Sequence, residues 1–105
     1  MSDVYTKSLA RGTMAAGTSS VIYTVPAGVR TVVRDIETVL ATGTSALHYL
    51  QVNGAVNAVI IPLDTANPWR QWRGEIVLDV GDTLTLFAVT GGVFYNYSGW
   101  ELTLP

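Results

Sequence analysis

The sequence contains no cysteine and only one histidine, His48. The absence of cysteine excludes a disulfide framework, a thiolate metal site and a cysteine nucleophile. A single histidine is too few for a metal site of the cupin type, which needs several. No nucleophile-elbow sequence accompanies His48, so a Ser-His-Asp arrangement is not indicated and we expect a structural histidine at the edge of the core or in an interface. We therefore expect no cofactor and no bound metal.

Charge is also scarce. Charged residues make up 13% of the chain, against about 25% in a typical domain. The 6 basic residues are too few and too scattered for a phosphate-tracking face, so we expect no nucleic acid partner. No apolar run approaches the ~20 residues of a membrane span and residues 1–8 show no signal region, so we expect no membrane contact and synthesis in a cytoplasm. A surface with so little charge is typical of a protein that covers part of it with a partner.

Strand patterns fill the chain from residue 20 onward. Apolar residues alternate over 21–25, Pro26 and Gly28 fit a type I turn, and residues 31–40 are rich in β-branched side chains. The dipeptide Asn53-Gly54 between two apolar runs is a strong hairpin signal. Strands at intervals of roughly 8–12 residues, with no amphipathic helix, predict an all-β fold: a jelly-roll-like β-sandwich of about eight antiparallel strands.

The alternation is imperfect in the long strand over residues 31–40. Arg34 shares a face with Val32 and Ile36, so either a bulge shifts the phase or both faces of the strand are partly covered. Trp100 alternates with polar residues, which places it in the core. We expect Pro62 to end the strand that begins at residue 56.

Residues 1–19 differ in composition from the rest. They are rich in Ala, Gly, Ser and Thr, with a short strand possible around Val4, Tyr5 and Leu9. Such a composition cannot form its own core. We expect residues 1–19 to be a flexible N-terminal arm that orders against a partner, and residues 20–105 to be the β-sandwich domain.

Aromatic residues suggest protein interfaces, where Trp and Tyr are enriched. Trp69 and Trp72 stand in a polar setting, which suits an interface, although anchoring in the core or a loop is the alternative. Other apolar residues fall on faces opposite the expected core and need cover from another subunit. The interface candidates are Trp69, Arg70, Trp72, Arg73, Tyr49, Phe87, Val89, Tyr5 and Leu9.

Two pairs of carboxylates invite a chemical interpretation. Asp35 and Glu37 share a strand face at roughly 7 Å, a separation compatible with glycoside hydrolysis. Solvated or interfacial carboxylates, which can pair with Arg30 or Arg34, are the simpler interpretation. Asp79 and Asp82 flank a turn and offer oxygen ligands to calcium, but turn formation alone explains them. We expect no enzymatic activity.

Four stretches carry a resemblance to a known class of proteins. They are residues 23–36 (YTVPAGVRTVVRDI), 74–78 (GEIVL), 80–84 (VGDTL) and 98–102 (SGWEL). In these stretches the chain resembles small jelly-roll accessory proteins of tailed bacteriophage virions, such as capsid decoration proteins. The resemblance implies a virion component, often a trimer, without enzymatic activity. It does not separate a capsid role from a tail role.

We therefore expect a non-enzymatic structural protein of the virion, made in the host cytoplasm, that binds the phage capsid surface as a decoration or stabilising protein. Its expected partners are copies of itself, as a homo-oligomer that the resemblance makes a trimer, and a phage capsid or tail protein. The alternative is a phage tail or fibre module that binds host carbohydrate through surface aromatics or binds another tail protein. A hydrolase using Asp35 and Glu37 is a third hypothesis.

Overall fold

The computed structural model describes residues 7–53 and 56–105. These residues form antiparallel strands and no helix, which confirms the all-β prediction. The strands are β1 (Lys7–Met14), β2 (Thr18–Thr24), β3 (Val29–Thr42), β4 (Ser45–Val52), β5 (Val56–Asp64), β6 (Trp69–Leu78), β7 (Thr83–Ala88) and β8 (Gly92–Thr103).

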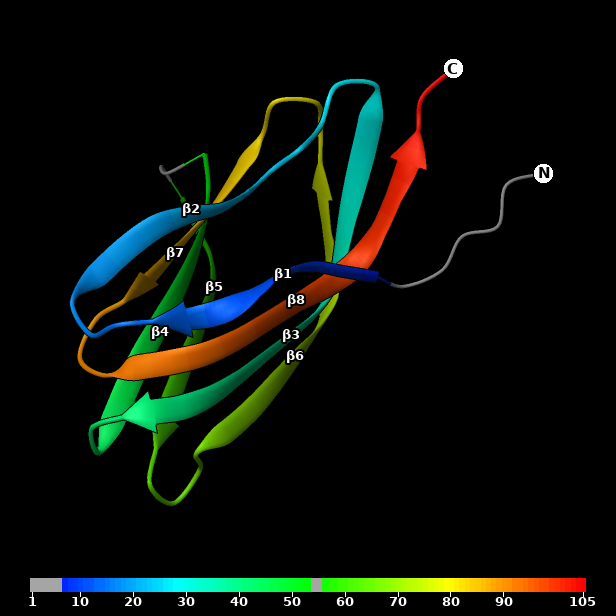
Figure 1. The fold of residues 1–105 in the computed structure, drawn as a ribbon. Coiled ribbons are helices and arrows are strands. Elements are labelled where there is room, and N and C mark those ends of the chain that lie inside the picture. The colour runs from blue at the N-terminus through cyan, green and yellow to red at the C-terminus, as the bar shows by residue number, and fades with distance from the viewer. Residues whose placement is uncertain (1–6, 54–55) are drawn as a thin grey trace.

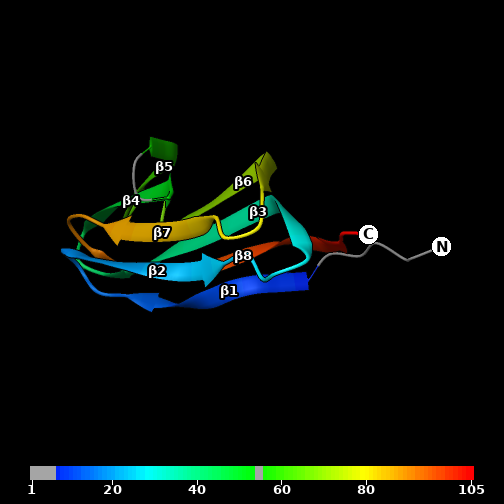
Figure 2. The same cartoon turned by 90° about the horizontal axis from the view of Figure 1, so that it is seen from above.

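Two 4-stranded sheets make the sandwich (Figure 1). Sheet A has the order β1-β8-β3-β6, and sheet B has the order β2-β7-β4-β5. The pairing is nested: β4 pairs with β5, β3 with β6, β2 with β7, and β1 with β8. This is the strand arrangement of a jelly roll, so the predicted architecture is confirmed. At one edge of the sandwich β1 lies beside β2, and at the other β5 lies near β6 (Figure 2).

The core lies between the sheets and follows the alternation of the strands. Ile36 and Tyr97 of sheet A are fully buried against the inner face of sheet B, which contributes Leu50 and Leu86. Successive strand residues point to opposite faces, so the residues between these core positions form the two outer faces of the sandwich.

A bulge in β3 explains its imperfect alternation. The register of β3 with β6 and β8 shifts between Val33 and Asp35, leaving Arg34 as the extra residue. A bulge changes the phase of the strand, so Ile36 faces the core while Val32 lies on the outer face. Of the two alternatives that the sequence leaves open, the bulge is the one present.

The position of Trp100 differs from the expectation. Trp100 lies opposite Val32 on the outer face of sheet A, with the Arg34 guanidinium carbon 5.4 Å from the centre of its ring. The alternation of β8 turns Tyr97 and Gly99 inward, so Trp100 faces outward and the core prediction is wrong. A Cβ on Gly99 would lie 1.9 Å from the Val32 carbonyl oxygen, so β8 and β3 approach each other too closely there for any side chain at position 99.

The predicted hairpin at Asn53-Gly54 is confirmed, because β4 and β5 pair on either side of it. Asn53 has a φ of 56°, the left-handed conformation that such turns require. Pro62 does not end its strand, since β5 continues to Asp64. The proline is tolerated because β5 is an edge strand with β4 on one side only.

Residues 7–19 do not form a separate arm, because they belong to two strands of the sandwich and the turn between them. β1 pairs with β8 from Lys7 to Met14, and Met14 is buried in the core. β1 is held at the edge of the sheet by backbone hydrogen bonds to β8, and residues with small side chains form these bonds as well as large ones do. β2 begins at Thr18, so the expected boundary at residue 19 falls inside a strand of sheet B. Val4 and Tyr5 lie outside the described residues.

Candidate functional site

The strands of sheet B are almost without charge. Apart from Asp64 at the end of β5, they contain no Asp, Glu, Lys or Arg. Because alternate residues fill the core, the residues between them form an outer surface that we call the sheet B outer face. Asp64, opposite Ser45 and in phase with Ile60 and Pro62, is the one charged strand residue on it. Its apolar members are Val21, Leu47, Tyr49, Ile60, Pro62, Phe87 and Val89.

Strand register places these residues in rows across the sheet. Ile60 of β5 lies opposite Tyr49 of β4, which lies opposite Phe87 of β7. The rings of Tyr49 and Phe87 stack with centroids 6.3 Å apart and planes inclined at 23°. In the next row Leu47 lies opposite Pro62, and the Leu47 carbonyl accepts a hydrogen bond from the Val89 N–H at 2.9 Å. These two rows therefore form an apolar patch that contains the aromatic pair, and the row on the other side of that pair, which contains Val21, also carries Thr85 and Gln51.

Sheet A has the opposite character. Its strands carry Lys7, Arg11, Arg30, Arg34, Asp35, Glu37, Arg70, Arg73, Glu75 and Glu101. Several of these form exposed ion pairs, such as Arg34 with Glu75 at 3.0 Å and Arg73 with Asp35 at 3.0 Å. The charge of the strands is thus concentrated on one sheet, and the sheet B outer face is the candidate assembly surface.

The interface candidates separate into two groups. Tyr49, Phe87 and Val89 come together on the sheet B outer face, which confirms that they face away from the core. The other described candidates belong to sheet A, and Tyr5 lies outside the described residues. Leu9 of β1 is half-buried and packs against the core.

The four candidates on β6 do not form one patch. Trp69 is exposed on the outer face of sheet A, and Arg73 pairs there with Asp35. Trp72 faces inward and packs against the core, so the core alternative holds for that residue. Gly74 leaves room for it, because a Cβ at position 74 would lie 2.6 Å from the Trp72 ring. Arg70 is exposed, lies opposite Thr38 and has the same phase along β6 as Trp72, two residues further on.

Sequence reasoning missed several members of the sheet B outer face, namely Val21, Leu47, Ile60 and Pro62. A signal for them was present, because no charged residue occurs between Glu37 and Asp64. An uncharged run that long must place some of its residues on an outer face, since each strand buries only alternate side chains.

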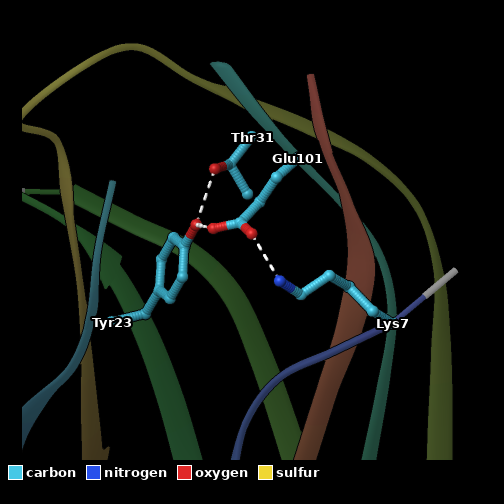
Figure 3. A network of polar contacts seen from close by, with 4 residues as sticks. All are labelled: Lys7, Tyr23, Thr31 and Glu101. Carbon is cyan, nitrogen blue, oxygen red and sulfur yellow. Dashed lines mark hydrogen bonds and ion pairs between the residues drawn. The ribbon is translucent and has the colours of Figure 1, made fainter. Parts of the chain in front are cut away.

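A cluster of polar side chains links the two sheets at one end of the sandwich (Figure 3). The Tyr23 hydroxyl of β2 donates to Glu101 Oε2 of β8 at 2.6 Å and also contacts Thr31 Oγ1 of β3 at 2.7 Å. Lys7 Nζ of β1 donates to the other carboxylate oxygen, Glu101 Oε1, at 2.5 Å. Four strands from both sheets therefore meet in this cluster.

The electrostatics of this cluster are those of a structural link. Burial, together with the hydrogen bond to Glu101, raises the pKa of Tyr23 to about 12. The hydrogen bonds from Lys7 and then Tyr23 hold the pKa of Glu101 below its ordinary value. The tyrosine stays protonated and the carboxylate stays ionised at neutral pH, so each keeps the hydrogen bond that joins the sheets.

His48 is a core residue. It is fully buried on the inner face of β4, and its Nε2 shares a 2.5 Å hydrogen bond with the Tyr97 hydroxyl across the sandwich. Burial lowers the pKa of His48 to about 4, so the imidazole is neutral at physiological pH. Among the described residues no partner reaches His48 Nδ1. The expectation of a structural histidine fits this position.

Three of these four carboxylates, Asp35, Asp79 and Asp82, make contacts within the fold, whereas Glu37 has no hydrogen bond or ion pair with a described residue. Asp35 accepts from Arg73, rather than from Arg30 or Arg34 as expected. Asp82 accepts from the Asp79 N–H at 2.9 Å and from Asn53 Nδ2 at 3.1 Å, closing the turn after β6. Hydrogen bonding to Asp79 and Asn53 holds the pKa of Asp82 below its ordinary value. Within residues 7–53 and 56–105 no cluster of three or more His, Asp or Glu residues is placed to hold a metal ion.

No helix with the length and apolar character needed to cross a membrane occurs in the part of the chain that the structure describes.

Comparisons with known proteins give a fold and no family. No family model and no curated protein sequence matches this chain. Among solved structures, the chain is similar to a chain in the acidic stable capsid structure of Helicobacter pylori bacteriophage KHP30. That match has a TM-score of 0.61 at 9% identity and covers 96% of this chain and 94% of the other. The expected resemblance to phage virion proteins is thus confirmed at the level of the fold.

A second similar structure is that of Bacillus endospore appendages, which form a family of disulfide-linked pili. It matches with a TM-score of 0.48 and 14% identity, over 99% of this chain and 93% of that chain.

Proposed function

We propose that this protein is a non-enzymatic structural component of a phage virion, which associates with copies of itself and binds the capsid surface as a decoration protein. The sheet B outer face makes the contacts between copies. The observation that carries the proposal is that this face combines an apolar surface with very little charge, since Asp64 at the end of β5 is the one charged residue of its strands.

The energetics favour association through this face. Ile60 and Val21 expose 53% and 55% of their surface, around the stacked Tyr49 and Phe87 rings. Burying ~400 Å² of apolar surface per copy would stabilise a complex by about 10 kcal/mol before costs, at ~25 cal/mol per Å². Lost rotational and translational freedom offsets much of this. Uncharged groups add little further desolvation cost, so a net gain remains.

The fold supports a virion role. The jelly roll is shared with a chain from a phage capsid structure along nearly the whole length of both proteins. Jelly rolls place two sheets back to back, so one sheet can serve contacts between copies while the other faces a different environment. Trimeric assembly follows from the resemblance to decoration proteins, since an apolar face favours burial without selecting a symmetry.

The test compares two matched substitutions. Ile60→Glu places a charge on edge strand β5 of sheet B, and Val77→Glu places one on edge strand β6 of sheet A, where Val77 is 57% exposed. Multi-angle light scattering should give an oligomer, expected to be a trimer, for the wild type and Val77→Glu, and a smaller species for Ile60→Glu. Sedimentation with purified capsids lacking this protein should show weakened binding for Ile60→Glu only.

Two outcomes would contradict the proposal. A wild-type monomer at micromolar concentration would remove the self-association. Equal masses for the two glutamate variants would show that the sheet B outer face makes no contact between copies. A stable dimer would keep the contact and remove the trimer.

A further inference from the structure

A row of exposed apolar residues crosses the outer face of sheet A, on the side of the sandwich opposite the proposed assembly surface. Phe94 of β8 lies opposite Val39 of β3, which lies opposite Trp69 of β6. These residues are 51%, 37% and 53% exposed. The two aromatic residues stand two strand spacings apart, roughly 10 Å. We call Phe94, Val39 and Trp69 the aromatic row.

Hydrogen-bonding groups lie in the adjacent row, roughly 7 Å along the strands. Asn96 of β8, Glu37 of β3 and Gln71 of β6 are in register there. Glu37 is half-buried, and no described residue makes a hydrogen bond or ion pair with its carboxylate. The Asn96 Oδ1 accepts from Ser8 at 3.1 Å, and the Gln71 Nε2 donates to Asp35 at 3.4 Å.

These bonds use one end of each amide. Within the described residues, the Nδ2 donor of Asn96 and the Oε1 acceptor of Gln71 have no recorded hydrogen bond, and the Glu37 carboxylate has two acceptor oxygens. A ligand lying over both rows would therefore meet aromatic and apolar surface along one side and a line of donors and acceptors along the other.

Charges on this face have both signs. Arg11 lies opposite Asn96, and Arg73 lies two residues beyond Gln71, where it pairs with Asp35. A polyanion or a strongly basic peptide would meet like charges as well as opposite ones. A second copy of the chain presenting the sheet B outer face, whose strands contain no Lys or Arg, would leave Glu37 without a partner, which is costly when buried. A neutral ligand rich in hydroxyl groups satisfies both rows.

We infer that the outer face of sheet A binds a neutral oligosaccharide along the aromatic row. Pyranose rings present C–H bonds on their flat faces, which suit the electron-rich faces of Trp69 and Phe94, and hydroxyls at their rims, which suit Glu37, Asn96 and Gln71. The two rings are too far apart for one sugar unit, so the ligand is a chain of sugars. The site lies on the sheet that the proposed assembly leaves uncovered.

Affinity electrophoresis tests this inference. The full-length protein is run in native gels that contain dextran, mannan, galactan or mixed-linkage β-glucan. At least one polysaccharide should retard the wild type, and Trp69→Ala and Phe94→Ala should each weaken that binding roughly tenfold, as loss of a stacking contact does. Glu37→Gln should weaken it less, because an amide keeps one acceptor. Val77→Ala, on the same outer face but outside both rows, is the matched control and should bind as the wild type does.

Three results would overturn the inference: no retardation by any of the polysaccharides, equal retardation of the wild type and both aromatic variants, or equal loss in Val77→Ala. If no gel retards the protein while Trp69→Ala and Phe94→Ala lose binding to capsids, the aromatic row is a protein contact and the sugar site is wrong. Thermal unfolding of each variant shows that it is folded. Light scattering reports assembly separately, so a failed assembly proposal and a failed sugar site give different results.

Discussion

His48 shows what a buried ionisable side chain costs in a small sandwich. It lies between the sheets with Tyr97 as its hydrogen-bond partner. The buried Tyr97 hydroxyl also has its pKa raised by burial, so the pair is neutral over the whole physiological range. The pair packs as core and adds a polar contact that fixes the two sheets relative to each other.

The lowered pKa of His48 predicts loss of stability in mild acid. The unfolded chain takes up a proton near the ordinary value of 6.5, but the folded protein takes it up only near 4. Between these values the unfolded state binds more protons, so the stability is fully present above pH 6.5 and falls as the pH is lowered, by about 3 kcal/mol in all. Urea unfolding at a series of pH values measures this.

The control is His48→Gln, which keeps a neutral polar group beside Tyr97 and removes the titration. Between pH 6.5 and 5 carboxylates contribute little, because their ordinary pKa values are about 4. The variant should therefore lose the slope of stability against pH in that interval. A slope that persists in His48→Gln would assign it to another group.

At the scale of the strands, the cluster around Glu101 joins β1 to the rest of the sandwich. β1 is an edge strand, and the Lys7 ammonium reaches the same carboxylate that receives the Tyr23 hydroxyl from the opposite sheet (Figure 3). Because the pKa of Glu101 is lowered, this contribution to stability is present above the ordinary pKa of a glutamate and is lost as the pH falls through the lower, folded value.

Tyr23→Phe should destabilise the fold by about 1–3 kcal/mol, because it removes a hydrogen bond to a charged group and leaves the buried Thr31 hydroxyl unpaired. Tyr49→Phe is the matched control, since the Tyr49 hydroxyl makes no recorded hydrogen bond within the described residues. Thermal or urea unfolding compares them. Equal stability of the two variants would show that the cluster contributes nothing to the fold.

The strands also show how far sequence reasoning reaches. Alternation and turn residues were sufficient for the hairpin at Asn53 and for the outward direction of Tyr49 and Phe87. They failed for Trp100, because both sides of β8 carry large aromatic side chains, Tyr97 on one and Trp100 on the other. Alternation alone does not select the side that faces the core, which in the folded sandwich is the side of Tyr97. Local composition likewise concealed β1, because its residues pair with residues of β8 that lie between 79 (Met14 with Val93) and 92 (Lys7 with Gly99) positions further along the chain.

The candidate site was only partly predictable for a related reason. Tyr49, Phe87 and Ile60 come from three strands, and their alignment in one row depends on register, which is a property of the folded sheets. The division of charge between the sheets is likewise visible only after the strand order is known. Trp69 and Trp72 are close in sequence yet lie on opposite faces of β6, because they are three positions apart and successive side chains of a strand alternate between its faces.

For the whole molecule, the division of charge predicts how association responds to salt. Contacts between uncharged faces are not screened by ions, whereas contacts through the ion pairs of sheet A would weaken. The dissociation constant of the oligomer, measured by sedimentation equilibrium, should therefore change less than about twofold between about 0.05 and about 0.5 M NaCl. Clear weakening in salt would point to the charged sheet as the contact.

The nested pairing has a consequence for the order of events during synthesis. The β4–β5 hairpin can close first, and sheet B has all its strands once β7 has left the ribosome. Sheet A must wait for β8, which lies between β1 and β3, so β1 stays without its partner until residues 92–103 have been made. Pairs this distant in the chain form slowly. A nascent chain therefore presents its uncharged sheet before its charged one is complete, and neighbouring chains on one messenger RNA have the chance to meet through that sheet while they are still being translated.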